Sequence, residues 1–148
     1  MIERLSKGES LRLYYDSTCI LSSGKSWLHP LLDLTREISS LSVDANRLFL
    51  IDTITGKAAA FLVVRLGIKR LYAGIMSDLA SEVLDRAGAE YSSNIRVPRI
   101  DCQTEEILAS VFDPEVAYEL ILGRAEQAKK RALESGSTNS LGTGTGNG

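Results

Sequence analysis

The chain has 148 residues, of which 44% are hydrophobic and 24% charged, and its formal net charge is −2. This length and composition predict one globular domain with a substantial core, and they exclude a fibrous or fully disordered chain. The weak net charge predicts neither nucleic acid nor an anionic membrane as a partner. No apolar run reaches the roughly 20 residues that a membrane-spanning helix needs.

The first third of the chain predicts a hairpin followed by a helix. Residues 10–15 and 18–21 have the composition of β-strands, and a polar turn beginning at Asp16 joins them, as is typical of a β-hairpin. Pro30 then suits the first turn of a helix whose apolar side continues to Ile38. We expect the hairpin to form an antiparallel edge of a sheet.

The centre of the fold is predicted at residues 48–66. The apolar run 48–51 indicates a strand buried on both faces, because a strand with one wet face would alternate. Asp52 ends this strand, and a polar turn over residues 53–56 leads into a helix over residues 57–66 that is apolar almost all round. Open α/β sheets bind ligands beyond the carboxyl ends of their strands, so this turn is the first place to look for a site.

The second half of the chain continues the alternation of strands and helices. Its predicted elements are a strand at 69–73, a turn at 74–77, a helix at 78–87, an extended segment at 89–100, a short helix at 102–112 and a final amphipathic helix from residue 113. From Glu134 the composition changes to Gly, Ser, Thr and Asn, which predicts an unstructured tail. We therefore expect one domain over residues 1–133 and a tail over residues 134–148. The order predicts an α/β fold with three layers, α/β/α, around a mixed sheet.

Several segments also carry a resemblance to a known family. They are P-L-L-D-L at 30–34, D-T-I-T-G-K-A-A-A at 52–60, Y-A-G-I-M-S at 72–77, and residues 91–106 with V-P-x-I and C-x-x-E-E. On these residues the chain resembles the DUF1893 family over roughly residues 10–122. The resemblance implies a cytidine-deaminase-like α/β/α domain, and it implies no reaction because the family has no established one.

The sequence argues against a zinc deaminase. Such an enzyme needs a His or Cys ligand and a catalytic Glu at the start of one helix, and two Cys at the start of the next. The two helices here open with Gly56-Lys57-Ala58-Ala59 and Ser77-Asp78-Leu79-Ala80, and the chain has one His and two Cys in all. We therefore expect no metal site and no cofactor.

The turn before residue 57 favours an anion. It resembles a phosphate-binding P-loop only in part, since Ile51 stands where the first Gly is required and Ala58 where Ser or Thr would hold magnesium. Free N–H groups at a helix N-terminus and a lysine nevertheless suit a phosphate. The plain alternative is that Thr55 caps the helix and Lys57 lies in solvent. The predicted ligand-binding residues are Asp52, Thr53, Thr55, Gly56 and Lys57, with Ser77 and Asp78 from the neighbouring turn.

Two residues are candidates for catalysis. At the end of the predicted strand, Asp52 is placed to act as a base, as a nucleophile or as a hydrogen-bond acceptor for a ribose hydroxyl. The alternative is a structural role, in which its side chain accepts hydrogen bonds from the backbone of its own turn. Cys102 is a candidate thiol nucleophile, but Glu105 and Glu106 make its surroundings acidic and favour a structural cysteine.

The sequence leaves three functions open. The first is a domain that binds a nucleotide or a related phosphorylated small molecule in a metal-free cleft. The second is an enzyme that uses Asp52 or Cys102 covalently on such a ligand. The third is an interaction module that forms a homodimer through a sheet edge or the final helix. Residues 1–8 lack the apolar run of a signal peptide, and the cysteines form no C-x-x-C pair, so we expect a cytoplasmic protein.

Overall fold

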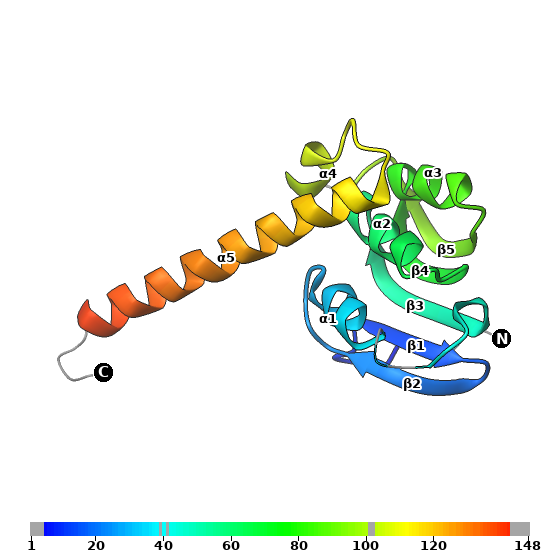
Figure 1. Cartoon of the computed structure of the whole chain (residues 1–148), viewed down its shortest axis with the longest axis horizontal. Helices are drawn as coiled ribbons and strands as arrows, with labels where there is room; N and C mark the ends of the chain where they lie inside the picture. The colour runs from blue at the N-terminus through cyan, green and yellow to red at the C-terminus, as the bar shows by residue number, and fades with distance from the viewer. Residues whose placement is uncertain (1–4, 39, 41, 101–102, 143–148) are drawn as a thin grey trace.

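A five-stranded mixed sheet organises the molecule, as the computed structural model shows for residues 5–38, 40, 42–100 and 103–142 (Figure 1). The strands lie in the order β2-β1-β3-β4-β5. β1 is antiparallel to β2 and to β3, whereas β3, β4 and β5 are parallel. The predicted mixed α/β fold with an N-terminal hairpin is confirmed. The strand bounds are β1 Leu11–Tyr15, β2 Thr18–Ser23, β3 Leu48–Thr55, β4 Arg70–Ser77 and β5 Glu90–Val97.

The helices flank this sheet and share one core with it. They are α1 His29–Ile38, α2 Lys57–Arg65, α3 Asp78–Arg86, α4 Gln103–Ile107 and α5 Pro114–Gly142, and a short 3-10 helix, η1, spans Ala45–Arg47. Leu13, Leu50 and Leu71 from the sheet join Phe61 and Ile121 from the helices in a single buried cluster. The connections through α1, α2 and α3 each lead from one strand to a parallel strand that lies nearer to β5 in the sheet. Right-handed connections that advance in the same direction place their helices on the same face of the sheet.

The other face of the sheet borders a second cavity. Ile51 and Tyr72 point to this face, where they border a cavity of about 550 Å³ together with residues 5–9. Ile51 is buried but lies outside the core cluster that the helices share. Within the described residues, the segment that reaches this face precedes β1 and contains a turn at residues 7–8.

The helix α2 is the centre of the packing, as the sequence predicts. Every residue from Lys57 to Val63 is buried. The helix contacts α1, α3, α4 and α5 as well as β3. Its alanines let it lie close to its neighbours, since Ala59 and Ala60 are almost fully covered. The prediction of a buried strand that feeds a buried helix is confirmed.

The strands extend further than the polarity of their residues indicates. β3 continues through Thr55 and β4 through Ser77, so the turns predicted at 53–56 and 74–77 are wrong. The reason is pairing with distant segments, because the parallel partners Ile54 and Ile75 hold both backbones extended. Gly74 permits this approach, since a Cβ there would lie 2.8 Å from the carbonyl oxygen of Thr53. The segment predicted as irregular at 89–100 likewise contains β5.

The last helix also differs from the expected boundary. α5 continues to Gly142, beyond the start of the tail predicted at residue 134, and residues 143–148 lie outside the described residues. Helix elongation adds one hydrogen bond for each residue fixed, and residues 134–142 contain no proline to stop it. Figure 1 shows α5 leaving the body and projecting beyond it. Side chains are described as far as Glu134, and all of those from Glu126 onward are exposed.

Candidate functional site

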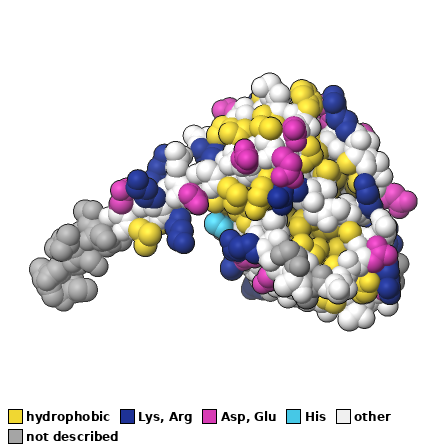
Figure 2. Space-filling model, in the orientation of Figure 1, with side chains coloured by type: hydrophobic (Ala, Val, Ile, Leu, Met, Phe, Trp, Pro, Cys, Tyr) yellow, Lys and Arg dark blue, Asp and Glu magenta, His cyan; other side chains and the backbone are white. Residues whose placement is uncertain are grey.

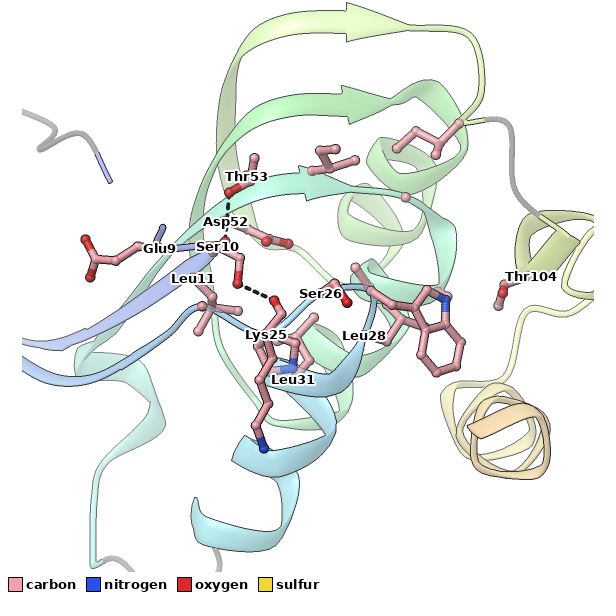
Figure 3. A pocket seen from close by; sticks show the side chains of 18 of the residues that line it. Glu9, Ser10, Leu11, Lys25, Ser26, Leu28, Leu31, Asp52, Thr53 and Thr104 are labelled. Carbon is pink, nitrogen blue, oxygen red and sulfur yellow. Dashed lines mark hydrogen bonds between the residues drawn. The ribbon is translucent and has the colours of Figure 1, made fainter. Parts of the chain in front are cut away.

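A cavity of about 500 Å³ lies between the N-termini of α1 and α2. The start of β1 and the loop before α1 form one side, β3 and the start of α2 form the second, and α4 closes the third (Figure 3). Most of its wall is apolar, with Leu11, Leu28, Leu31, Ala58 and Ile100 among the lining residues. The cavity therefore lies at the carboxyl edge of β3, where the sequence places a site.

Asp52 is the polar centre of this cavity. Its residue is 9% exposed, and the Thr55 hydroxyl donates a hydrogen bond of 2.9 Å to its Oδ2. Burial raises the pKa of Asp52 to about 7, although hydrogen bonds from Thr55 and from the N–H groups of Thr53 and Ile54 act in the opposite direction. A carboxyl group with this pKa is present in both protonation states near neutral pH. Figure 3 shows its side chain directed from β3 into the cavity.

The other predicted residues of this segment take different positions. Thr53 lines the cavity, and its hydroxyl donates to the carbonyl oxygen of Ser10 at 2.9 Å. Thr55 is fully buried behind Asp52 and does not line the cavity. Gly56 lines the cavity and is the N-cap of α2, without a side-chain hydrogen bond of its own. The expectation that Thr55 caps this helix is therefore wrong.

The N-terminus of α2 is occupied by a residue that the sequence analysis did not assign. The Glu105 carboxylate accepts a hydrogen bond from the Lys57 N–H at 2.7 Å and from the Ser77 hydroxyl at 3.1 Å through Oε2. Its Oε1 accepts from the Ile100 N–H at 2.7 Å, and the residue is only 2% exposed. The position predicted for a ligand anion thus holds a carboxylate of the chain itself. The only sequence signal was the C-x-x-E-E segment.

The ammonium group of Lys57 does not reach the cavity. Its Nζ donates to the carbonyl oxygen of Ala109 at 3.2 Å and lies 5.0 Å from the centre of the Phe112 ring. Burial lowers the pKa of Lys57. The side chain follows the helix surface toward the connection between α4 and α5, so the structure does not bring this predicted cation to Asp52.

The two predicted residues of the neighbouring strand serve α3. Ser77 is fully buried, and its hydroxyl oxygen accepts from the Ala80 N–H at 3.0 Å as the N-cap. Asp78 accepts from Arg96 at 2.7 Å on the surface. Neither lines the cavity. The structure therefore brings Asp52, Thr53 and Gly56 to one cavity and places the remaining predicted residues behind or beside it.

Trp27 is a further lining residue that the sequence analysis missed. It is the single tryptophan of the chain, is 42% exposed and has a φ of 57°, in the left-handed region. Its ring packs edge-on against His29 with the ring centres 5.3 Å apart. An aromatic residue beside His-Pro at a helix start was the available signal. The ring forms part of the cavity wall from the loop before α1.

Metal and membrane features were sought among the described residues. No group of three or more His, Cys, Asp or Glu side chains there is arranged to hold a metal ion. Cys102, the candidate nucleophile, lies outside the described residues. Within the described part of the chain, no helix combines the length and apolar character required to cross a bilayer.

Comparison with known families assigns the chain. A family model described as "TM1506: Domain of unknown function (DUF1893)" matches residues 1–123. The chain belongs to the DUF1893 family. A crystal structure of a DUF1893 family protein (TM1506) from Thermotoga maritima is similar, with a TM-score of 0.70 and 24% sequence identity over 80% of this chain and 82% of that chain. At this identity the likeness shows the shared fold. A search of the curated proteins finds no match.

Proposed function

We propose that this DUF1893 protein binds a nucleotide-like small molecule, with the heteroaromatic base inside the cavity between α1 and α2. The observation that carries the proposal is a cavity of about 500 Å³ with apolar walls and two buried carboxyl groups, Asp52 and Glu105, at the carboxyl edge of the sheet. Small-molecule sites are typically concave and apolar, with a few placed polar groups that fix orientation. A base has apolar faces and a polar edge, which match these walls and Asp52.

The phosphate of such a ligand belongs at the mouth of the cavity in this proposal. The N–H group of Lys57 is bonded to Glu105, so it has no free proton to offer a phosphate. Lys25 lines the cavity from the loop before α1, and its side chain is 62% exposed beside Asp33. Trp27 adds a ring face near the same loop, on which a base or sugar can pack.

The single tryptophan provides the test. We expect nucleosides and nucleotides to change the fluorescence of Trp27 and to raise the melting temperature, because a ligand that binds only the folded state stabilises it by mass action. Trp27→Phe is the matched control, since it should abolish the fluorescence change and keep a melting shift. If no nucleoside or nucleotide produces either signal in the wild-type protein, the proposal is wrong.

An enzymatic reaction on the same ligand is the second candidate, and the pKa of Asp52 favours it. A carboxyl group with a pKa of about 7 is suited to accept or donate a proton at neutral pH. Mass spectrometry of each binding ligand after incubation would detect a product, and Asp52→Asn should abolish its formation. The cytidine-deaminase-like fold and the absence of zinc stay predictions, and elemental analysis of the purified protein checks the second.

A homodimer through α5 is the third candidate. Beyond Ala125 every described side chain of α5 is exposed, and Leu133 is 64% exposed. Figure 2 shows this arm standing clear of the body. A groove of about 940 Å³ lies between α1 and α5, and both small residues such as Ala128 and charged residues such as Asp33 and Arg36 border it. In a two-fold dimer, the arm of each copy fills the groove of the other.

Sedimentation of the full chain tests the dimer. Ala128→Glu places a larger side chain in the groove and should shift the dimer toward monomer, because it fills space that the partner's arm would occupy. Arg131→Glu introduces the same side chain at a position of α5 that does not line the groove and should leave association intact. A wild-type chain that sediments as a monomer at every concentration would exclude this candidate.

A further inference from the structure

Acidic residues outnumber basic residues in the wall of the cavity. Four charged residues line it: Glu9 before β1, Lys25 in the loop before α1, Asp52 on β3 and Glu105 on α4. Glu9 is paired with Arg12, and Lys25 is paired with Asp33. Glu105 is held by N–H and hydroxyl donors of the chain. Asp52 is likewise bonded by neutral groups, in its case the Thr55 hydroxyl and the N–H groups of Thr53 and Ile54.

Two hydroxyl groups of the wall are already committed as donors to the backbone. Ser10 Oγ donates to the carbonyl oxygen of Lys25 at 2.6 Å, and the Thr53 hydroxyl donates to that of Ser10. Figure 3 shows both of these bonds beside Asp52. These protons therefore point away from a ligand. Ser26 and Thr104 also line the cavity, and the charged acceptor beside the two committed hydroxyl groups is the Asp52 carboxylate.

We infer that the cavity selects ligands whose buried edge presents N–H donors or a positive charge to Asp52, and that it rejects ligands that present an anion there. The inference rests on the proposed function of the cavity and names the chemical class that enters it. An amino group beside a ring N–H, or an amidinium group, has this edge. A phosphate or carboxylate has no such edge. Its negative charge would face Asp52 and Glu105, and the ligand would bring no cation to offset the repulsion.

The physical reason is the cost of a buried charge. An ionised carboxylate without a cationic partner is unfavourable in an apolar cavity. A ligand that donates hydrogen bonds to it, or that carries a positive charge, offsets this cost. The carboxylate accepts at about four positions in total, and the neighbouring groups fill only some of them. A donor ligand thus binds the ionised form of Asp52 and displaces its proton.

Three probes of one shape separate the possibilities. Benzamidine is a cation, benzamide is neutral and benzoate is an anion, although all three have the same flat ring and a planar substituent. We expect benzamidine to bind the full-length protein most tightly and benzoate not to bind, as measured by Trp27 fluorescence. With only the ionised form of Asp52 competent, benzamidine affinity should rise by up to about 100-fold between pH 5 and pH 8.

Asp52→Asn is the decisive variant. It keeps the shape of the side chain, removes its charge, and should lower benzamidine affinity at pH 8 by at least about 10-fold while abolishing the pH dependence. Asp85→Asn on α3 makes the same change at a carboxyl group that bonds Tyr91 and does not line the cavity, and it should behave like the wild-type protein. The melting temperature of each variant shows that it is folded.

The outcomes separate this inference from the proposed function. If nucleosides bind but benzoate binds as well as benzamidine, or Asp52→Asn keeps the preference, the inference is wrong and the proposed function stands. If benzamidine binds through Asp52 and no nucleoside or nucleotide does, the charge selection stands and the proposed ligand is wrong. If neither class of compound binds, both are wrong.

Discussion

Asp52 is a buried carboxyl group, and the hydrogen-bond partners that the described residues give it are neutral. Its pKa of about 7 in the folded protein exceeds the ordinary value of 3.8, and burial is the main cause. Between these two values the folded chain keeps a proton that the unfolded chain has released. Unfolding is therefore accompanied by proton release in this window, and the free energy of unfolding must fall as the pH rises.

The first prediction concerns this pH dependence. Between pH 5 and pH 8 we expect the wild-type protein to lose on the order of 2–4 kcal/mol of unfolding free energy relative to Asp52→Asn, which cannot ionise. Urea denaturation of both proteins across this range measures the difference directly, and the other titrating groups cancel in the comparison. Parallel curves for the two proteins would show that Asp52 titrates normally and is not desolvated.

Glu105 holds three separate segments at one carboxylate. Its oxygens accept from the N–H groups of Lys57 and Ile100 and from the hydroxyl of Ser77, so it connects α2, the segment before α4 and the start of α3. All three donors would lack a partner in the chain if the carboxylate were removed. A side chain with this role acts on stability more than on any ligand.

The second prediction follows from these bonds. Glu105→Ala should lower the free energy of unfolding by about 2–4 kcal/mol, because buried donors without partners retain their desolvation cost. Glu106→Ala is the matched control, because Glu106 is exposed and its ion pair with Arg99, at 3.8 Å, lies on the surface. This variant should change the free energy of unfolding by less than about 0.5 kcal/mol. Equal effects at the two positions would contradict the structural role of Glu105.

Among the elements, the strand β3 and the helix α2 were the most predictable. Each contains a continuous apolar run, at 48–51 in β3 and 58–64 in α2, so the burial of these runs follows from the residues themselves. Strand ends were not predictable in the same way, because Thr53 to Thr55 are polar or exposed locally and remain extended only through pairing with β4. The role of Glu105 was not predictable for the same reason, namely a contact with a distant segment. Glu105 bonds the N-terminus of α2 from a position 48 residues further along the chain.

The third prediction tests the packing of α2. Ala60→Leu should cost about 1–3 kcal/mol of unfolding free energy, because Ala60 is fully buried, does not line the cavity, and the added carbon atoms must displace neighbours. Ala109→Leu adds the same atoms at an exposed position after α4 and should be close to neutral. A neutral Ala60→Leu would show that this side of α2 has free space, in conflict with its burial.

At the scale of the whole molecule, the region that the family model matches ends close to the last residue of α5 that packs against the core. The family model matches residues as far as Gly123, and Ala125 is the last residue of α5 that packs against the core. The helix then continues for 17 residues to Gly142, which is about 25 Å at 1.5 Å per residue. Helices of this length are marginal in water without packing, so the arm has little stability of its own.

The fourth prediction separates the arm from the body by concentration. A chain ending at Ala125 should unfold at the same temperature as the full chain in dilute solution, because the described residues removed are all exposed. If the arms pair two copies, the melting temperature of the full chain should rise with protein concentration while that of the shortened chain stays constant. Calorimetry of both chains over a dilution series measures this. A shortened chain that melts lower at every dilution would show instead that the arm stabilises its own body, which its exposed side chains contradict.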